Sequence, residues 1–238
     1  MKLFSKILVS SSLMASFSPL YAANSPLGIS GNLTLTTDYV FRGLTQTNEE
    51  PAIQGGFNVE HDSGVYAGLW GSSLNFDEAG VEDRAHVEID YSVGYAQHLP
   101  SGTTYGLGWA YYTYPGAGGH LNYDFHEVVL DLGYERAGTT FGFAYAYSPE
   151  FFGEVGQAHY FQLKLGQTTS QGLGLNAYVG RQAFSDNDMA GDDYTDYGVS
   201  MSYSIQNYFD VSINYTDTDL DNVEAAKGRA FFMISKDF

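Results

Sequence analysis

Apolar and polar residues alternate along several segments of this chain. From Ala85 to Ala96 one parity reads Ala-Val-Ile-Tyr-Val-Tyr, and the other carries His86, Glu88 and Asp90 among small residues. Successive side chains of a strand point to opposite faces, so this period of two predicts a strand with one apolar and one polar face. The same alternation recurs in segments 29–39, 105–111, 141–147, 160–165, 197–205 and 209–215, and it predicts an all-β protein.

Short and long connections alternate between these segments. Short turns are expected at 61–64, 99–102, 136–138, 168–172 and 206–207, and longer loops at 42–51, 75–84, 114–124, 148–157, 185–193 and 217–227. An even number of strands with tight turns on one side is typical of bacterial outer-membrane barrels. We therefore predict a transmembrane antiparallel β-barrel of about 12 strands, with short periplasmic turns and long extracellular loops.

A soluble β-sandwich would also give alternating strands, but its strands usually span only about 5–6 residues. The polar faces here are rich in Gly, Ser, Asn and acidic residues, and the apolar faces are rich in Tyr and Phe towards the strand ends. This distribution fits a lumen and a lipid-facing surface with aromatic girdles. A closed barrel also leaves no unpaired strand edge in lipid.

The two ends of the chain carry export signals. Lys2 and Lys6 precede an apolar stretch that is shorter than the about 20 residues of a spanning helix, and Ala22 follows at the expected cleavage point. We predict residues 1–22 as a signal peptide and residues 23–238 as an outer-membrane β-barrel. The terminal Phe238 resembles the C-terminal signal that barrel-assembly machinery recognises. Lys236 departs from that signal, which usually has an apolar residue two positions before the last one. The expected partners are that machinery, outer-membrane lipids, lipopolysaccharide and small hydrophilic solutes.

Composition excludes several function classes. Lys and Arg total 10 against 28 Asp and Glu, which gives a formal charge of −18, so the basic footprint of a nucleic-acid partner is missing. The chain has no cysteine, which excludes disulfide scaffolds and thiol-based metal or catalytic sites. Most acidic residues fall in the long loops, where Asp217-x-Asp219-x-Asp221 begins like a calcium loop but lacks its later ligands. We interpret these loops as solvated and repulsive, and we expect no cofactor or metal.

Two stretches resemble a known family. Segment 33–47, reading LTLTTDYVFRGLTQT, and segment 51–57, reading PAIQGGF, are similar to the N-terminal signature of the TorF-type porins, the Gcw_chp family. Segments 64–72 and 88–95 also fit that family, and the likeness runs through the whole mature chain. The resemblance implies an outer-membrane barrel assigned to transport, with no catalytic motif or defined substrate to transfer.

Parity places a set of charged residues in the lumen or at its mouths. We predict the pore-lining residues Asp38, Arg42, Glu60, His86, Glu88, Asp90, Glu127, Asp131, Lys164, Asp196 and Asp210, with Arg229 as a further base. Acids exceed bases in this set, and charged rings set the selectivity of pores, so we predict passive diffusion with a preference for cations or neutral solutes. Acidic oligosaccharides would need runs of arginines, which bind carboxylates bidentately, and the predicted lumen has no such run. Small lumen residues favour a narrow open channel over a filled barrel, although an inward-folded loop could constrict it.

Two alternatives remain at this stage. A non-conducting structural or adhesive barrel would bind a partner through its loops, and Phe151-Phe152 is the best candidate contact. An outer-membrane lipid hydrolase could use His120 or His126 near one outer loop. The chain contains no Gly-x-Ser-x-Gly elbow and no His-Glu-x-x-His pair, so we predict that it is not an enzyme.

Overall fold

The computed structural model describes residues 20–21, 26–76, 84–206 and 208–238. The predicted signal peptide falls almost entirely outside the described residues, as does the predicted cleavage point at Ala22. The described exception is the short strand β1 (Leu20–Tyr21), whose backbone pairs with Gly28 and Ile29 of the next strand.

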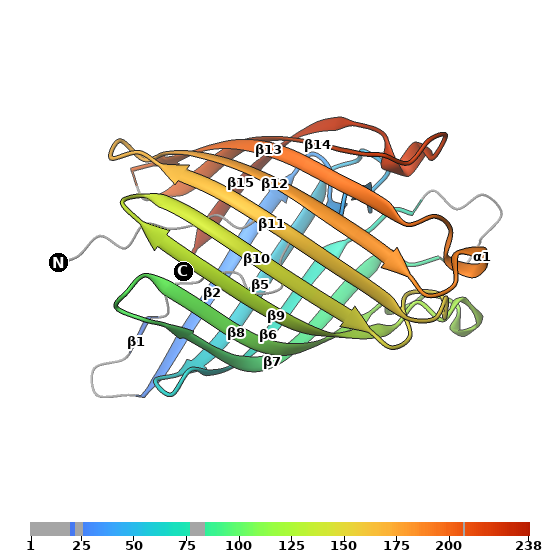
Figure 1. The fold of residues 1–238 in the computed structure, drawn as a ribbon, viewed down its shortest axis with the longest axis horizontal. Coiled ribbons are helices and arrows are strands. Elements are labelled where there is room, and N and C mark those ends of the chain that lie inside the picture. Colours follow the sequence, from blue (N-terminus) through green and yellow to red (C-terminus); the bar gives the residue numbers. More distant parts are fainter. Residues whose placement is uncertain (1–19, 22–25, 77–83, 207) are drawn as a thin grey trace.

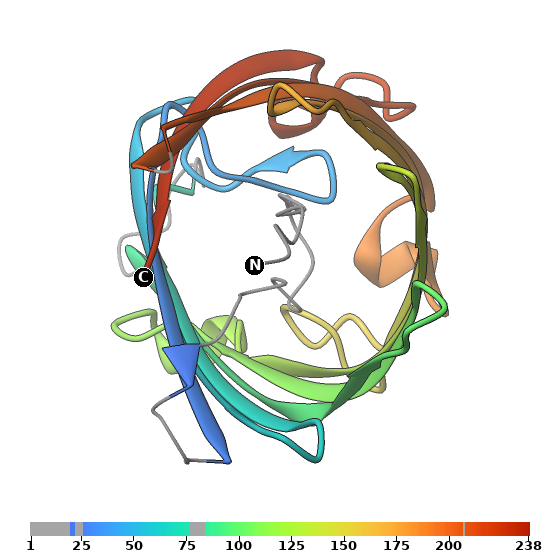
Figure 2. The same ribbon diagram turned by 90° about the vertical axis from the view of Figure 1, so that its left-hand side faces the viewer.

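Twelve long antiparallel strands form one closed sheet, which confirms the predicted barrel (Figure 1; Figure 2). Each strand pairs with its neighbour along the chain, and the last strand pairs with the first to close the ring. The strands of the barrel are β2 (Leu27–Thr36), β5 (Ala52–His61), β6 (Val65–Ser73), β7 (Val87–His98), β8 (Thr103–Thr113), β9 (Phe125–Arg136), β10 (Thr139–Ser148), β11 (Ala158–Thr168), β12 (Leu173–Phe184), β13 (Tyr194–Ile205), β14 (Phe209–Thr218) and β15 (Arg229–Asp237).

The closing seam lies between β15 and β2. Five residue pairs, from Met233 opposite Thr36 to Asp237 opposite Asn32, are in register there. The terminal Phe238 extends the ladder, because its backbone N–H donates to the carbonyl of Gly31 at 2.8 Å and its carbonyl accepts from the Gly31 N–H at 3.2 Å. The ring therefore has no open edge, which is what lets strands lie in lipid.

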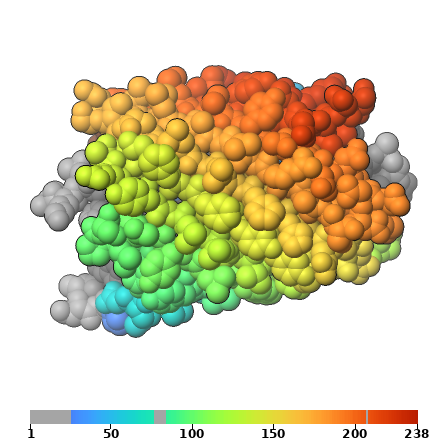
Figure 3. Space-filling model, viewed as in Figure 1, coloured from blue at the N-terminus to red at the C-terminus, as the bar shows by residue number. Residues whose placement is uncertain are grey.

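Apolar side chains cover the outside of the ring. Leu35, Leu107, Phe141, Leu163 and Phe232 are each more than half exposed, and they lie on the parity predicted to face lipid. The space-filling view shows strands side by side in a continuous wall on this face (Figure 3). Exposed apolar surface of this extent fits a hydrocarbon environment and not water.

Connections lie at opposite ends of the barrel according to their length (Figure 1). The tight turns and the C-terminus share the periplasmic end, and the long loops share the other, extracellular end. In the described parts of the long loops lie three short helices, namely η1 (Gly119–Leu121), α1 (Asn187–Ala190) and η2 (Glu224–Ala226). No helix among the described residues is long and apolar enough to span a bilayer.

The predicted parity fails at two strand ends. Strand β7 begins at Val87, after a bend at His86 that turns His86 outward and buries Ala85 completely. Strand β2 ends at Thr36, before the predicted limit at Tyr39, because the chain turns into the lumen at this point. Tyr39 therefore does not face lipid but packs edge-on against Trp70 at 5.5 Å between ring centres.

Candidate functional site: the lumen and its inward hairpin

A small hairpin folds into the barrel from the first extracellular loop. It consists of β3 (Val40–Phe41) and β4 (Leu44–Thr45), joined by a two-residue turn. Arg42 and Gly43 both have positive φ, 49° and 81°, which is the backbone of a type I′ turn. Seen along the barrel from the periplasmic end, this light-blue segment lies inside the ring (Figure 2). The long loop expected at 42–51 thus folds inward, which is the arrangement named above as one that could constrict the channel.

Arg42 at the tip of the hairpin contacts the opposite wall of the barrel. Its guanidinium donates to Glu127 on β9 at 2.7 Å and to Gln182 on β12 at 3.0 Å. It also lies over the rings of Tyr160 on β11 at 4.3 Å and Phe41 at 4.7 Å. Burial alone would lower the pKa of Arg42, but the attraction of Glu127 outweighs it and raises that pKa above its usual value. The tip therefore stays charged and bridges the lumen.

Asp38 anchors the base of the hairpin. Its carboxylate accepts hydrogen bonds from the hydroxyls of Thr45 at 2.5 Å and Thr47 at 2.9 Å. It also forms an ion pair with Arg229 on β15 at 3.3 Å, and both side chains are about 95% buried. Ion pairs at the base and at the tip therefore fix the hairpin at two points, and truncating one partner of either pair would strand a buried charge.

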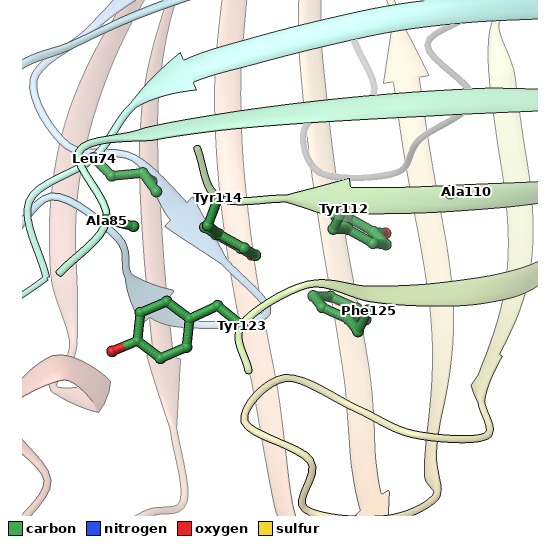
Figure 4. Close-up of a cluster of buried hydrophobic side chains, with 7 residues drawn as sticks. All are labelled: Leu74, Ala85, Ala110, Tyr112, Tyr114, Tyr123 and Phe125. Carbon is green, nitrogen blue, oxygen red and sulfur yellow. The ribbon is translucent and has the colours of Figure 1, made fainter. Parts of the chain in front are cut away.

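Aromatic side chains fill the extracellular end of the lumen around the hairpin (Figure 4). Tyr112 and Phe125 stack at 4.3 Å, and Tyr123 stacks on Phe152 at 4.3 Å. Phe151 lies 4.7 Å from the Phe125 ring and also faces Arg42. The prediction that Phe151-Phe152 offers an exposed contact for a partner is therefore wrong, because both rings pack inward against this cluster.

Four carboxylates surround the hairpin tip with little exposure to solvent. Glu88, Asp90, Glu127 and Asp196 are each at least 95% buried. Tyr114 donates to Glu88 at 3.1 Å and Tyr160 donates to Asp196 at 3.1 Å, whereas Arg42 is the one cation that contacts any of the four among the described residues. Burial and these acids together raise the pKa of Tyr39 and Tyr114 well above the usual value, so both phenols remain hydrogen-bond donors.

Below the hairpin the lumen contains a cavity of about 320 Å³ that extends towards the periplasmic end. The hairpin and the acids Asp90 and Glu127 line its hairpin end. The rest of its wall combines apolar and aromatic side chains, such as Val129 and Tyr178, with small neutral polar ones, including Thr34, Gln54, Ser92, Asn176, Ser202, Ser212 and Asn214. A volume of this size is in the range of small-molecule pockets.

The other predicted pore residues lie at different heights. Lys164 on β11 lines the cavity, and its charge attracts Asp131 on β9. Asp210 is buried near the periplasmic start of β14, where Ser204 donates a hydrogen bond to it. Glu60 is half-buried near the periplasmic end of β5, and His86 is exposed outside the strands. The structure therefore brings Asp38, Arg42, Glu88, Asp90, Glu127 and Asp196 together and leaves His86 apart.

The hairpin could have been found in the sequence by its turn chemistry. Val40-Phe41 and Leu44 are apolar residues on either side of Arg42-Gly43, and a two-residue turn ending in glycine between apolar residues is a hairpin signature. The aromatic cluster leaves a weaker signature, because Tyr114 and Tyr123 come from the two ends of one connection and Phe152 comes from another.

The histidines of the hydrolase alternative do not join the buried acids. His126 lies against Trp109 on the outer face at 6.0 Å between ring centres, whereas the neighbouring Glu127 points into the lumen. Adjacent residues of a strand face opposite sides, so these two side chains cannot act together. Among the described residues, no group of three or more His, Asp or Glu could hold a metal ion.

Solved structures with a similar fold are outer-membrane proteins. A KdgM porin matches with a TM-score of 0.58 at 7% identity over 88% of this chain and 98% of that chain. A NanC porin matches with 0.55 at 12% identity over 87% and 98%, and the outer membrane protein opdK from Pseudomonas aeruginosa with 0.50 at 13% identity over 91% and 68%. At these identities the likeness establishes an outer-membrane porin fold.

Sequence comparisons identify a family for this chain but no curated relative. A search of curated proteins finds no match. The model of the family described as "Bacterial protein of unknown function (Gcw_chp)" matches residues 21–237, which confirms the predicted family, whereas the TorF-type designation stays a prediction. The chain therefore belongs to the Gcw_chp family.

Proposed function

We propose that this protein is a narrow outer-membrane channel for the passive diffusion of small hydrophilic solutes, and that it prefers cations or neutral solutes to anions. The observation that carries the proposal is the excess of acids around the constriction, where Glu88, Asp90, Glu127 and Asp196 lie buried and Arg42 pairs with Glu127. In a narrow low-dielectric lumen, an excess of fixed negative charge attracts cations and repels anions. The neutral polar wall of the cavity offers hydrogen bonds to uncharged solutes.

The hairpin determines how wide this channel is. It reaches from β2 across the lumen to β9, β11 and β12, so the permeable path is confined to the space beside it. We therefore expect a small conductance in the native protein and a larger one when residues 40–45 are replaced by a short Gly-Ser turn.

Planar-bilayer recording of the refolded protein tests the selectivity. Under a potassium chloride gradient, the zero-current potential should show a preference for potassium, and Asp90→Asn should reduce that preference because it removes a lumen charge. Asp188→Asn is the matched control, because Asp188 is exposed on α1 in an outer loop. A preference for chloride would contradict the proposal.

A non-conducting barrel is the second candidate, and the packing of the outer lumen is what favours it. Aromatic rings and the hairpin together fill the extracellular end. If both the native protein and the Gly-Ser variant are silent in bilayers, this second function replaces the first. Assays of phospholipid and lipid A hydrolysis then separate a structural barrel from a lipid hydrolase.

The proposal also covers how the barrel is assembled into the outer membrane. The backbone of Phe238 completes the seam with Gly31, while its side chain remains 61% exposed. An exposed terminal aromatic side chain is available to barrel-assembly machinery, and the outer loops lie at the end of the barrel where lipopolysaccharide would surround it. Phe238→Ala should lower the amount of assembled barrel in the outer membrane without changing the conductance of protein refolded in vitro.

A further inference from the structure

Asp90 is a buried acid without a cationic partner among the described residues. It is 5% exposed, it lines the hairpin end of the cavity, and its Oδ1 accepts no hydrogen bond. Across β8, Glu127 presents its Oε1 equally buried and without a donor, while its Oε2 is occupied by Arg42 and Tyr112. Buried carboxylates are costly unless they are paired, and Arg42 is bonded to Glu127, so Asp90 lacks a positive charge of its own.

Aromatic rings flank the same carboxylate on both sides. Trp70 on β6 and Tyr112 on β8 are the direct cross-strand neighbours of Asp90, and Tyr39 packs on Trp70 from the hairpin. All three line the cavity. Ring faces attract cations, and they also provide apolar contact for the carbon skeleton of an organic ion.

Arg42 shows that this lumen already holds a cation in such a setting. Its guanidinium combines a carboxylate, Glu127, with the rings of Tyr160 and Phe41. Asp90 with Trp70, Tyr39 and Tyr112 repeats the combination of acid and rings on the neighbouring part of the wall, and the cavity opens in front of it. A metal ion does not suit the site, because no group of three or more suitable ligands exists within the described part of the chain.

We infer that the hairpin end of the cavity binds a small organic cation with a primary ammonium group. The ammonium donates to Asp90 Oδ1, with Glu127 Oε1 as a second acceptor, and the carbon skeleton lies against Trp70 and Tyr39. This inference rests on the cation preference of the proposed channel and names the class of solute that the same lumen selects.

Trp70 supplies the probe for the test. The chain has two tryptophans, and the other, Trp109, lies on the lipid-facing side, so Trp109→Phe leaves Trp70 as the sole tryptophan. This variant is refolded in lipid vesicles, and its emission is titrated with n-butylammonium chloride. The neutral 1-butanol, the anionic sodium butyrate and potassium chloride serve as matched additions. We expect a saturable change with n-butylammonium and none with the other three.

Two further variants assign the effect to Asp90. Asp90→Asn in the Trp109→Phe background should weaken n-butylammonium binding at least about tenfold, because it removes a charge-assisted hydrogen bond. Asp210→Asn changes a lumen acid at the periplasmic end and should leave binding unchanged. An equal saturable response to 1-butanol or to potassium chloride overturns the inference, and so does unchanged binding by Asp90→Asn. The ligand series on Trp109→Phe alone decides the question if Asp90→Asn does not fold.

The two proposals fail in different ways. A barrel that binds n-butylammonium but is silent in bilayers contradicts the channel and leaves the ammonium site standing. A barrel that conducts with a preference for potassium but shows no saturable change in Trp70 emission contradicts the ammonium site alone.

Discussion

The extracellular and periplasmic ends of the lumen are built on the same strands but in different ways. At the extracellular end, rings stack at 4.3 Å and a charged hairpin bridges the walls, so the interior resembles the core of a soluble protein. Towards the periplasm, the inward positions carry small residues such as Ser202, Ser212 and Asn176, and a cavity remains. Alternation therefore decides which side chains point inward, whereas their size decides whether the interior is filled.

This difference also separates the roles of the two ends. A packed, ion-paired region adds stability and restricts passage, because each side chain is held by several neighbours. An open region lined by hydroxyls and amides adds little packing but lets a hydrated solute approach the constriction. The hairpin lies between these two regions. Substitutions in the packed region should therefore mainly change stability, whereas substitutions in the open region should mainly change conductance.

The largest effect is expected at Arg42. Arg42→Met leaves Glu127 buried without its cation, and breaking a buried pair in this way costs about 3–5 kcal/mol. It should also release the hairpin tip and raise the conductance. Urea unfolding of the refolded barrel, combined with bilayer recording, measures both effects.

A double variant tests whether the loss comes from the stranded charge. Arg42→Met with Glu127→Leu replaces the pair with apolar groups, and such replacements are often neutral for stability. The double variant should recover most of the lost free energy of unfolding. If it is no more stable than Arg42→Met, the stranded carboxylate is not the cause.

The barrel itself follows from the sequence, whereas the positions of the hairpin and of the aromatic cluster inside the lumen do not. Period-two alternation is local and repeats over many strands, so errors at single positions such as His86 and Tyr39 do not change the architecture. The lumen acids Glu88, Asp90 and Glu127 follow from the same parity. Loop position follows no period, because it depends on contacts such as Arg42 with Glu127, which are 85 residues apart. The turn of such a hairpin can be recognised in the sequence, but its contacts with a distant wall follow only from the closed barrel.

The next largest effect is expected at Gly43. A Cβ there would lie 2.5 Å from Thr218 Cγ2 and 2.8 Å from Asp196 Cβ, and the φ of 81° is unfavourable for alanine. Gly43→Ala combines a left-handed residue, at about 1–2 kcal/mol, with overpacking, at about 1–3 kcal/mol. Its control is Gly116→Ala, because Gly116 has a φ of 90° and no atom within 4 Å of the added Cβ. Urea unfolding of both variants isolates the packing contribution, and equal losses would show that the hairpin is not tightly seated against β13 and β14.

The smallest effects on stability are expected at two inward-facing alanines, one at each end of the lumen. Together they test the contrast between the two ends most directly. Ala110 on β8 belongs to the packed cluster, and Ala144 on β10 lines the cavity. Ala110→Leu should cost about 1–3 kcal/mol, because a packed interior cannot absorb the added carbons without strain. Ala144→Leu should change the free energy of unfolding by less than about 1 kcal/mol, since the cavity accommodates the side chain, but it should lower the conductance by narrowing the path. Urea unfolding and bilayer recording on both variants test the distinction. Equal destabilisation would mean that the cavity wall is as tightly packed as the extracellular end, and the contrast between filled and open lumen would then be lost.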